Sequence, residues 1–241
     1  TTGSSYYFNI RIINNAGLVT GTTSSDGVLI ETSSAPIVIS VTDNGIWQRN
    51  NHVLYAAWAS TIPAGATIQN YEYAVGTGPS RTQITTVIDW TTNNVIVHST
   101  WGYVTISTYP STGSLLNLTN SQVYFIGIRA KSSVGIYSDI KYSNGTTIDI
   151  TTPVVIVSLI SNYTSTGVIT FNWQEADDTP SGILSYDVQI TTMIDGTGIV
   201  KSDNVTGNRY TYHTGNSGTI YYVRTRARDV AGNIGDYSGY S

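Results

Sequence analysis

The sequence predicts an all-β protein made of tandem β-sandwiches, and three observations carry that prediction. An alternating apolar and polar segment occurs three times, starting at Tyr6, Tyr124 and Tyr221, with an Arg and then a Gly at fixed spacing in each copy. Such alternation before a small-residue turn is typical of a half-buried strand that enters a hairpin. Asp-Gly and Asn-Gly turn signals interrupt the chain at short intervals, and no segment has a convincing helical period. Three copies indicate an array of modules, and short strands with frequent turns favour sandwiches of two sheets.

The core of each module is predicted from two matched pairs of aromatic residues. The strands 37–41 and 154–160 follow Pro36 and Pro153 and are expected to open two modules. Two alternating strands, 52–58 and 167–173, come next and end in Trp, and the strands 68–75 and 183–190 then carry a Tyr. The spacing from Trp58 to Tyr71 equals that from Trp173 to Tyr186, so the two modules are expected to share a fold anchored by these four residues.

The module ends give the domain boundaries. The segments 25–36 and 143–153 match each other as a last strand that runs through a Thr/Ser/Pro seam into the next module. We therefore expect a partial module over 1–35, a complete one over 36–152, and a third over 153–241 that lacks a clear last strand. Three explanations stay open: a window from a longer repeat protein, strands supplied by neighbouring subunits, or a shorter third module. The absence of an initial Met also suggests a processed product or a segment of something longer.

Composition sets further bounds. The chain of 241 residues has 40% hydrophobic residues, enough for real cores, but only 11% charged residues and a net charge of −4. This balance provides no electrostatic footprint for nucleic acid, and the Arg224, Arg226 and Arg228 row is expected to be solvated strand surface. No cysteine is present, so disulfides and thiolate metal sites are excluded. No apolar run is long enough for a membrane-spanning helix.

The repeated residues resemble a known family. Trp on the second strand, Tyr on the third and the Tyr-x-x-x-x-Arg-Ala-x-x-x-x-Gly pattern near the module end resemble fibronectin type III modules, which are immunoglobulin-like sandwiches. The segment 71–79, with Asp89-Trp90-Thr91 and the Thr-Pro seam, looks more closely like repeats of large bacterial and archaeal extracellular surface proteins. The resemblance covers nearly the whole chain and implies a spacer, an adhesive stalk or an accessory domain of a secreted enzyme.

The middle module departs from this pattern in one place. Residues 95–106 are longer than their counterpart in the third module and predict an enlarged hairpin. Trp90, Trp101 and Tyr103 lie in or near it and outside the repeated core positions. They either form a contact surface for a glycan or a protein, or cover the core of this module.

The sequence predicts neither an enzyme nor a bound cofactor. The three histidines have no ligand spacing, and neither a nucleophile elbow nor a phosphate-binding loop is present. The one acidic cluster, residues 175–182, is interpreted as a turn in which Asp177 and Asp178 cap backbone amides, as a Ca²⁺ site, or as a glycosidase pair. The middle module has Ile62-Pro63-Ala64-Gly65 at the same place, so any Ca²⁺ is expected to belong to one module only.

The sequence also predicts glycosylation sites and a function. Four sequons, at Asn117, Asn144, Asn162 and Asn204, would accept N-glycans in a glycosylating host. The leading interpretation is a non-catalytic structural or adhesive segment of an extracellular filament, sheath or giant cell-surface protein, with copies of itself or neighbouring repeats as partners. The alternative is a set of glycan-binding accessory modules of a secreted polysaccharide-acting enzyme, using Trp101, Tyr103 and Trp90.

Overall fold

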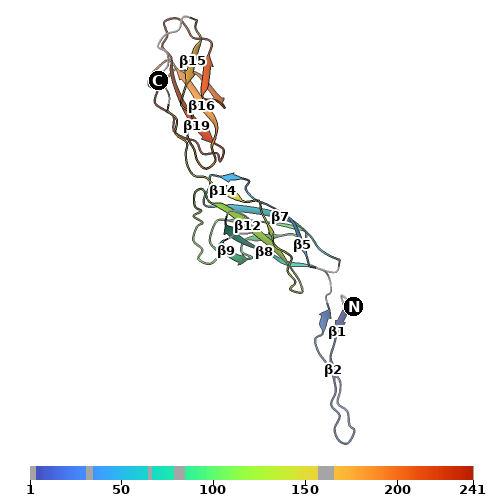
Figure 1. Ribbon diagram of the computed structural model, residues 1–241. Coiled ribbons are helices and arrows are strands. Elements are labelled where there is room, and N and C mark those ends of the chain that lie inside the picture. Colours follow the sequence, from blue (N-terminus) through green and yellow to red (C-terminus); the bar gives the residue numbers. More distant parts are fainter. Residues whose placement is uncertain (1–3, 31–34, 65–66, 79–84, 157–165, 241) are drawn as a thin grey trace.

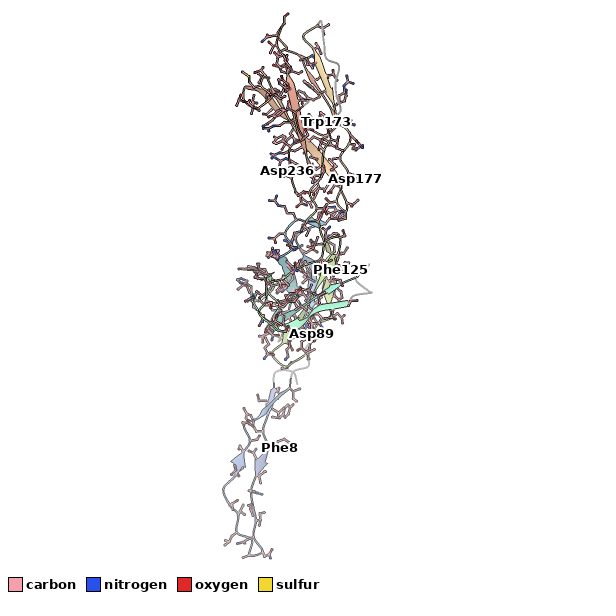
Figure 2. All side chains as sticks on the ribbon, turned by 90° about the vertical axis from the view of Figure 1, so that its left-hand side faces the viewer. Phe8, Asp89, Phe125, Trp173, Asp177 and Asp236 are labelled. Atoms are coloured by element: carbon pink, nitrogen blue, oxygen red, sulfur yellow. The ribbon has the colours of Figure 1, made fainter. Side chains whose placement is uncertain are left out.

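The computed structural model describes residues 4–30, 35–64, 67–78, 85–156 and 166–240. The chain forms three units that follow one another along a single long axis (Figure 1). All regular elements within the described residues are β-strands, and no helix long and apolar enough to cross a membrane occurs among them. A view turned by 90° keeps the elongated outline (Figure 2), so the protein is a rod.

The first unit is an antiparallel hairpin that projects from the rest of the chain. β1 (Ser4–Tyr6) pairs with β4 (Val28–Ile30), and farther out β2 (Asn9–Ile10) pairs with β3 (Thr23–Ser24). Near the tip Gly17 has a φ of 80°, a left-handed conformation that glycine adopts without a steric penalty. Phe8 stands well clear of the other units (Figure 2). Within the described residues, no second sheet covers the hairpin.

The second unit is a sandwich of two sheets. One sheet has the order β10-β11-β7-β5 and the other the order β6-β14-β12-β8-β9, with β13 also paired to β12. The first sheet consists of β5 (Ile37–Thr42), β7 (Leu54–Thr61), β10 (Val95–Val97) and β11 (Trp101–Ile106). The second consists of β6 (Trp47–Gln48), β8 (Ile68–Thr77), β9 (Thr85–Thr91), β12 (Val123–Ser132), β13 (Lys141–Tyr142) and β14 (Thr146–Ile148).

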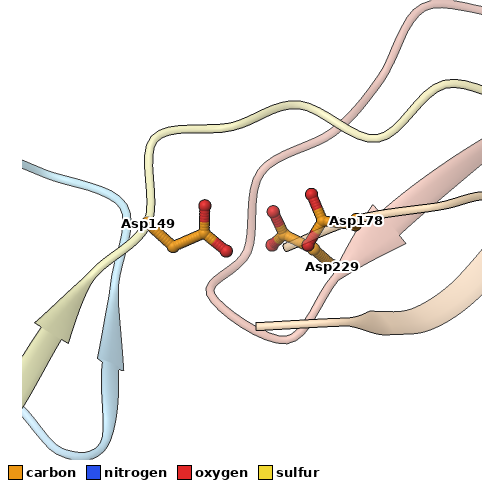
Figure 3. A group of neighbouring side chains, drawn as sticks. All are labelled: Asp149, Asp178 and Asp229. Atoms are coloured by element: carbon orange, nitrogen blue, oxygen red, sulfur yellow. The ribbon is translucent and has the colours of Figure 1, made fainter. Parts of the chain in front are cut away.

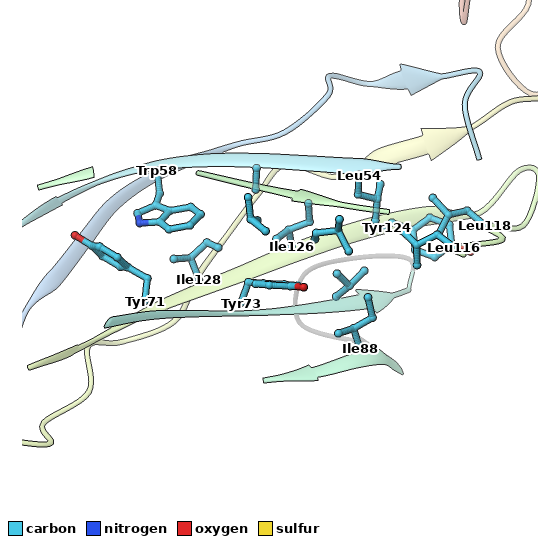
Figure 4. Packing of buried hydrophobic residues seen from close by; sticks show 14 of the residues in the cluster. Leu54, Trp58, Tyr71, Tyr73, Ile88, Leu116, Leu118, Tyr124, Ile126 and Ile128 are labelled. Carbon is cyan, nitrogen blue, oxygen red and sulfur yellow. The ribbon is translucent and has the colours of Figure 1, made fainter. Parts of the chain in front are cut away.

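The core of this module follows from alternation along its strands. On β7 the buried residues Leu54, Ala56 and Trp58 alternate with more exposed ones, so a single face enters the core. Figure 4 shows Trp58 and Tyr71 at one end of the core and Leu116 and Leu118 at the other. Trp58 lies opposite Gly102 on β11, where any Cβ would collide with the indole ring. This pairing explains why glycine interrupts an otherwise bulky strand.

The third unit repeats the plan with fewer strands. β17, β16 and β19 form one sheet in that order, and β15 pairs with β18 in the other. The strands are β15 (Ile169–Asn172), β16 (Ile183–Thr191), β17 (Ile199–Val205), β18 (Arg209–Tyr212) and β19 (Tyr222–Asp229). Part of the strand expected over 154–160 lies outside the described residues. The third module also has no hairpin corresponding to β10–β11, because its chain passes from β17 to β18 through residues 206–208.

The same aromatic pair anchors both sandwiches. The ring centroids of Trp58 and Tyr71 lie 5.3 Å apart at an interplanar angle of 60°, and those of Trp173 and Tyr186 lie 5.4 Å apart at 60°. All four side chains are buried. Edge-to-face packing of this kind adds to the free energy gained by removing large rings from water. The equal spacing in the sequence therefore corresponds to equal packing in space.

The chain after β19 returns along that strand without forming a further named strand in the described residues. The Gly235 amide donates to the Ala227 carbonyl at 3.0 Å, and the Ser238 amide donates to the Thr225 carbonyl at 2.8 Å. In the middle module the corresponding return continues into β14, which closes the sheet beside β12.

Candidate functional site

The junction between the second and third modules is built from backbone contacts and a few polar side chains. The Ser181 amide donates to Asp149 Oδ2 at 3.1 Å, and Asn233 Nδ2 donates to the Asp149 carbonyl at 2.8 Å. Arg49 reaches from the second module to the Gly232 carbonyl, with Nη1 at 2.8 Å. Within the third module, Gly235 packs against the carbonyl of Pro153, the first residue of this module, so closely that a Cβ could not be accommodated. The seam between these modules is therefore a specific interface.

Three aspartates from separate parts of the sequence meet at this junction. Asp149 follows β14, Asp178 lies between β15 and β16, and Asp229 ends β19. Figure 3 shows their carboxylates directed toward one another. One oxygen from each carboxylate lies within 4.8 Å of the others, and all three side chains are buried. The arrangement concentrates negative charge in a place that excludes water.

Asp149 and Asp229 are held by the turns around them. Asp149 Oδ1 accepts the Thr151 amide at 3.0 Å in addition to the contact with Ser181. Asp229 Oδ1 accepts the Asn233 amide and its Oδ2 accepts Asn233 Nδ2, both at 2.7 Å. These hydrogen bonds fix the direction of both carboxylates without the help of a ligand.

Asp178 is the least satisfied of the three. Its Oδ2 accepts the Gly182 amide at 3.2 Å and the Ser181 hydroxyl at 3.4 Å, whereas its Oδ1 is buried without a hydrogen-bond partner. Burial, followed by the charges of Asp149 and Asp229, raises the pKa of Asp178, and the two hydrogen bonds only partly oppose this.

The sequence singled out Asp177 and Asp178 as neighbours, and the structure separates them. Asp177 is exposed, and its backbone forms a bridge with Val154. Asp178 turns inward and meets residues that lie far from it in the sequence. The cluster draws Asp149 from the end of the second module, so it spans two modules, whereas the sequence analysis assigned the site to one. Nothing in the local pattern around Asp149 or Asp229 signalled this meeting.

A second feature is an aromatic row on the outer face of the four-stranded sheet. Trp101 and Tyr103 alternate with buried residues on β11, and Tyr55 on β7 extends the row. The ring centroids of Trp101 and Tyr103 lie 6.3 Å apart, as do those of Tyr103 and Tyr55. His98 stacks on Trp101 at 3.6 Å. Trp101 is 46% exposed although His98 covers one face of its ring, so part of the row is open to solvent.

Trp90 does not join this row. It lies on β9 in the other sheet, where the Arg129 guanidinium stacks over its ring at 4.2 Å. Arg129 in turn forms an ion pair with Glu72. The three aromatic residues expected to share one contact surface therefore lie in the two different sheets of the sandwich.

Arg224, Arg226 and Arg228 on β19 were expected to be solvated strand surface, but their side chains form hydrogen bonds to neighbouring side chains. Asp187 accepts from Arg226 Nε at 2.9 Å and from Arg228 Nη2 at 2.9 Å, while Arg224 bonds to Gln189 at 2.9 Å. Burial alone would raise the pKa of Asp187, but hydrogen bonds from Arg228, Asn204 and Arg226 outweigh it and lower the pKa to about 2. These residues form a structural ion network across the sheet.

The sequons differ in their surroundings. Asn117 and Asn144 are exposed, whereas Asn162 lies outside the described residues. Asn204 uses its amide nitrogen to donate to Asp187 at 2.9 Å and to Ser185 at 3.1 Å. A glycan on that nitrogen would displace these hydrogen bonds.

Comparison with known proteins places the fold. No family model and no curated protein matches the sequence. Among solved structures, domains A168–A170 of titin match with a TM-score of 0.54 and 18% identity, over 98% of this chain and 73% of that one. Chicken CNTN1 domains FN1–FN3 match with a TM-score of 0.46 and 16% identity, over 100% and 75%. Fibronectin(III)-like modules of CbhA from Clostridium thermocellum match with a TM-score of 0.41 and 14% identity, over 83% and 90%.

These likenesses concern the fold alone, since all identities are below 25%. The titin match agrees with the two-sheet modules described above. The chain is therefore an all-β protein of tandem immunoglobulin-like sandwiches with a fibronectin type III-like fold.

Proposed function

We propose that this chain is a non-catalytic structural or adhesive repeat segment of an extracellular filament, sheath or giant cell-surface protein. Its partners are copies of itself or neighbouring repeats, and its task is to set distance along an array. The fibronectin type III-like fold supports a modular role. The low content of charged residues and the absence of cysteine also suit a polar, weakly charged surface repeat.

The observation that carries the proposal is that the first hairpin copies a hairpin buried in the second module. The Phe8 amide donates to Ser25 Oγ and the Ser25 amide donates to the Phe8 carbonyl; Ile126 and Ser143 form the same two bonds. Phe8 nevertheless is 73% exposed, whereas Ile126 is 1% exposed. An identical backbone element thus lacks the covering sheet that its counterpart has.

Exposed apolar residues continue along the first hairpin. Ile10 and Ile12 are both exposed, whereas their counterparts Ile128 and Ala130 are fully buried. Covering such side chains contributes about 1.5–3 kcal/mol each. A sheet equivalent to β5, β7 and β11, supplied by a neighbouring repeat or subunit, would bury them by strand sharing. The exposed apolar face of this hairpin supports a role in which another β-sheet packs against it.

Photo-crosslinking in the native material tests the proposal. A benzophenone amino acid replacing Phe8 is expected to crosslink to a fibronectin type III-like sandwich, identified by mass spectrometry, while one replacing the exposed Met193 serves as control. Electron microscopy of the same material should show filaments or extended surface appendages. Discrete monomers without crosslinks from position 8 would contradict the proposal.

The aromatic row favours a second candidate function, glycan binding by an accessory module. Trp101, Tyr103 and Tyr55 form a row of partly exposed aromatic side chains on neighbouring strands, which is suited to contact with the apolar face of sugar rings. We expect Trp101→Ala to abolish binding on a glycan array, while Trp90→Ala, on the opposite sheet, leaves it unchanged. An array without hits for the unaltered chain would remove this candidate.

A further inference from the structure

The aspartate cluster at the second junction brings three buried carboxyl groups together, and none of them takes part in an ion pair among the described residues. The ion pairs among the described residues join Arg129 with Glu72, Lys201 with Asp203, and Arg226 and Arg228 with Asp187. None of them includes Asp149, Asp178 or Asp229. The nearby Arg49 directs its guanidinium to a backbone carbonyl instead. Buried charges in proteins are normally paired or bound to metal ions, so this cluster calls for a positive partner.

The unpaired oxygen of Asp178 indicates where that partner would lie. Asp178 is 9% exposed, its Oδ1 has no hydrogen-bond partner, and its carboxylate points toward the other two (Figure 3). Leaving a buried acceptor unsatisfied destabilises the folded state, and more so when the acceptor is charged. Each oxygen of Asp149 and Asp229 accepts one hydrogen bond, three from backbone amides and one from Asn233 Nδ2, and a carboxylate oxygen with one such bond keeps a lone pair for a further ligand.

The spacing of the oxygens fits a calcium ion. Ca²⁺ binds carboxylate oxygens at about 2.3–2.6 Å, so two ligands on opposite sides of the ion lie roughly 4.6–5.2 Å apart. The selected oxygens of the three aspartates lie within 4.8 Å of one another. Bidentate carboxylates and backbone carbonyls can complete the six to eight ligands that Ca²⁺ takes. Mg²⁺ prefers shorter distances and retains most of its water, which suits a dry cluster of carboxylates less well.

We propose that Asp149, Asp178 and Asp229 form a Ca²⁺ site that joins the second module to the third. Asp149 belongs to the end of the second module, whereas Asp178 and Asp229 belong to the third. A single ion bound to all three would therefore replace mutual repulsion with a bridge across the seam. The proposal stands independently of what the assembled array does outside the cell.

The repeat pattern offers an internal comparison. The corresponding positions at the first junction are Glu31, Pro63 and Ser132, as given by the matched Tyr, Trp and seam spacings. Only one of these three residues is acidic. The site is thus specific to one junction, and it adds calcium dependence to a single joint of the rod.

Titration of the metal-free 241-residue chain with CaCl₂ by calorimetry tests the site, together with thermal unfolding in CaCl₂, MgCl₂ or EDTA. We expect one Ca²⁺ per chain and a higher Tm in CaCl₂ than in EDTA, because an ion that binds only the folded state stabilises it by mass action. MgCl₂ at the same concentration should produce a much smaller shift.

Asp178→Asn is the sharpest variant, because the amide oxygen can still accept from Gly182 and Ser181 while the charge is lost. Its Ca²⁺ affinity should fall at least tenfold. In EDTA the variant should unfold at the same temperature as the unaltered chain or higher, since one repelling charge is gone. Asp177→Asn, at the exposed neighbouring position, is the matched control and should retain the full Ca²⁺ response.

Three results would overturn the proposal: no binding heat or Tm shift with Ca²⁺, an undiminished Ca²⁺ response in Asp178→Asn, or an equal loss in Asp177→Asn. A chain that becomes more stable on acidification in EDTA but ignores Ca²⁺ would also overturn it, because a shared proton would then neutralise the cluster. None of these results would bear on the crosslinking test at Phe8.

Discussion

Single residues explain most of what holds each module together. Trp173 and Tyr186 pack edge to face, and the Tyr186 hydroxyl accepts the Ala176 amide at 2.9 Å. Burial raises the pKa of Tyr186, because the ionised phenolate would be poorly solvated there. One aromatic pair therefore packs the core and also ties the loop after β15 to β16.

Replacing that anchor should unfold the third module selectively. We expect Trp173→Ala to reduce the free energy of unfolding of this module by about 3–5 kcal/mol, since a large buried ring leaves a cavity. Trp101→Ala, at an exposed ring, should change stability by less than about 1 kcal/mol. Urea unfolding followed by hydrogen exchange of each module measures both, and equal effects would contradict the packing described.

Asp187 makes the stability of the third module sensitive to acid. Its folded pKa of about 2 lies below the ordinary value of 3.8, so the ion network contributes stability above about pH 4 and loses it as the pH falls toward 2. We expect Asp187→Asn to cost on the order of 1–2 kcal/mol at pH 7, after allowance for partial solvent screening. The difference from the unaltered chain should shrink between pH 4 and pH 2 in urea midpoints; a constant difference would argue against this role.

At the scale of elements, the contacts between the second and third modules are the part of the structure that local sequence predicts least. The paired strands, their turns and the anchors Trp58 and Trp173 follow from periodicity and equal spacing, which depend on neighbours in the chain. The meeting of Asp149, Asp178 and Asp229 depends on how one module docks on the next. The sequence therefore predicted an acidic loop at Asp178 but not its partners. It likewise could not reveal that Trp90 and Trp101 belong to opposite sheets, because the position of an aromatic residue within a strand does not say which sheet that strand joins.

Gly235 tests how tightly the start of the third module is packed. A Cβ at this position would overlap the Pro153 carbonyl, a backbone atom that cannot move aside alone. We expect Gly235→Ala to destabilise the third module by about 1–3 kcal/mol, as overpacking generally does. Gly239→Ala, where an added Cβ meets nothing within 4 Å, is the control. Differential scanning calorimetry of both variants measures this loss of stability. Equal melting temperatures for the two variants would disprove the tight contact at Gly235.

At the scale of the whole molecule, the chain is a row of separate folding units. The core cluster of the second module and that of the third share no residue. The contacts across the seam are mostly hydrogen bonds to backbone groups. Each sandwich is therefore stabilised by its own core. The seam fixes the orientation of one module relative to the next but adds no large apolar interface.

Independent cores predict separate unfolding transitions. Leu54→Ala should lower the free energy of unfolding of the second module by about 2–5 kcal/mol, because Leu54 is almost wholly buried there. The transition of the third module should not move by more than about 0.5 kcal/mol, since distant sites behave additively. Calorimetry combined with limited proteolysis resolves the two transitions, and a common shift would indicate one cooperative unit.

The course of the chain through the second module has a consequence for pulling forces. The chain enters this sandwich at one pole and leaves it at the other (Figure 1), so tension applied to the rod runs through the long axis of the module. Under sufficient load the sandwich would open as a unit, and each freed residue would add up to about 3.3–3.6 Å of extended chain. A row of such modules would therefore lengthen in discrete steps under tension, one sandwich at a time.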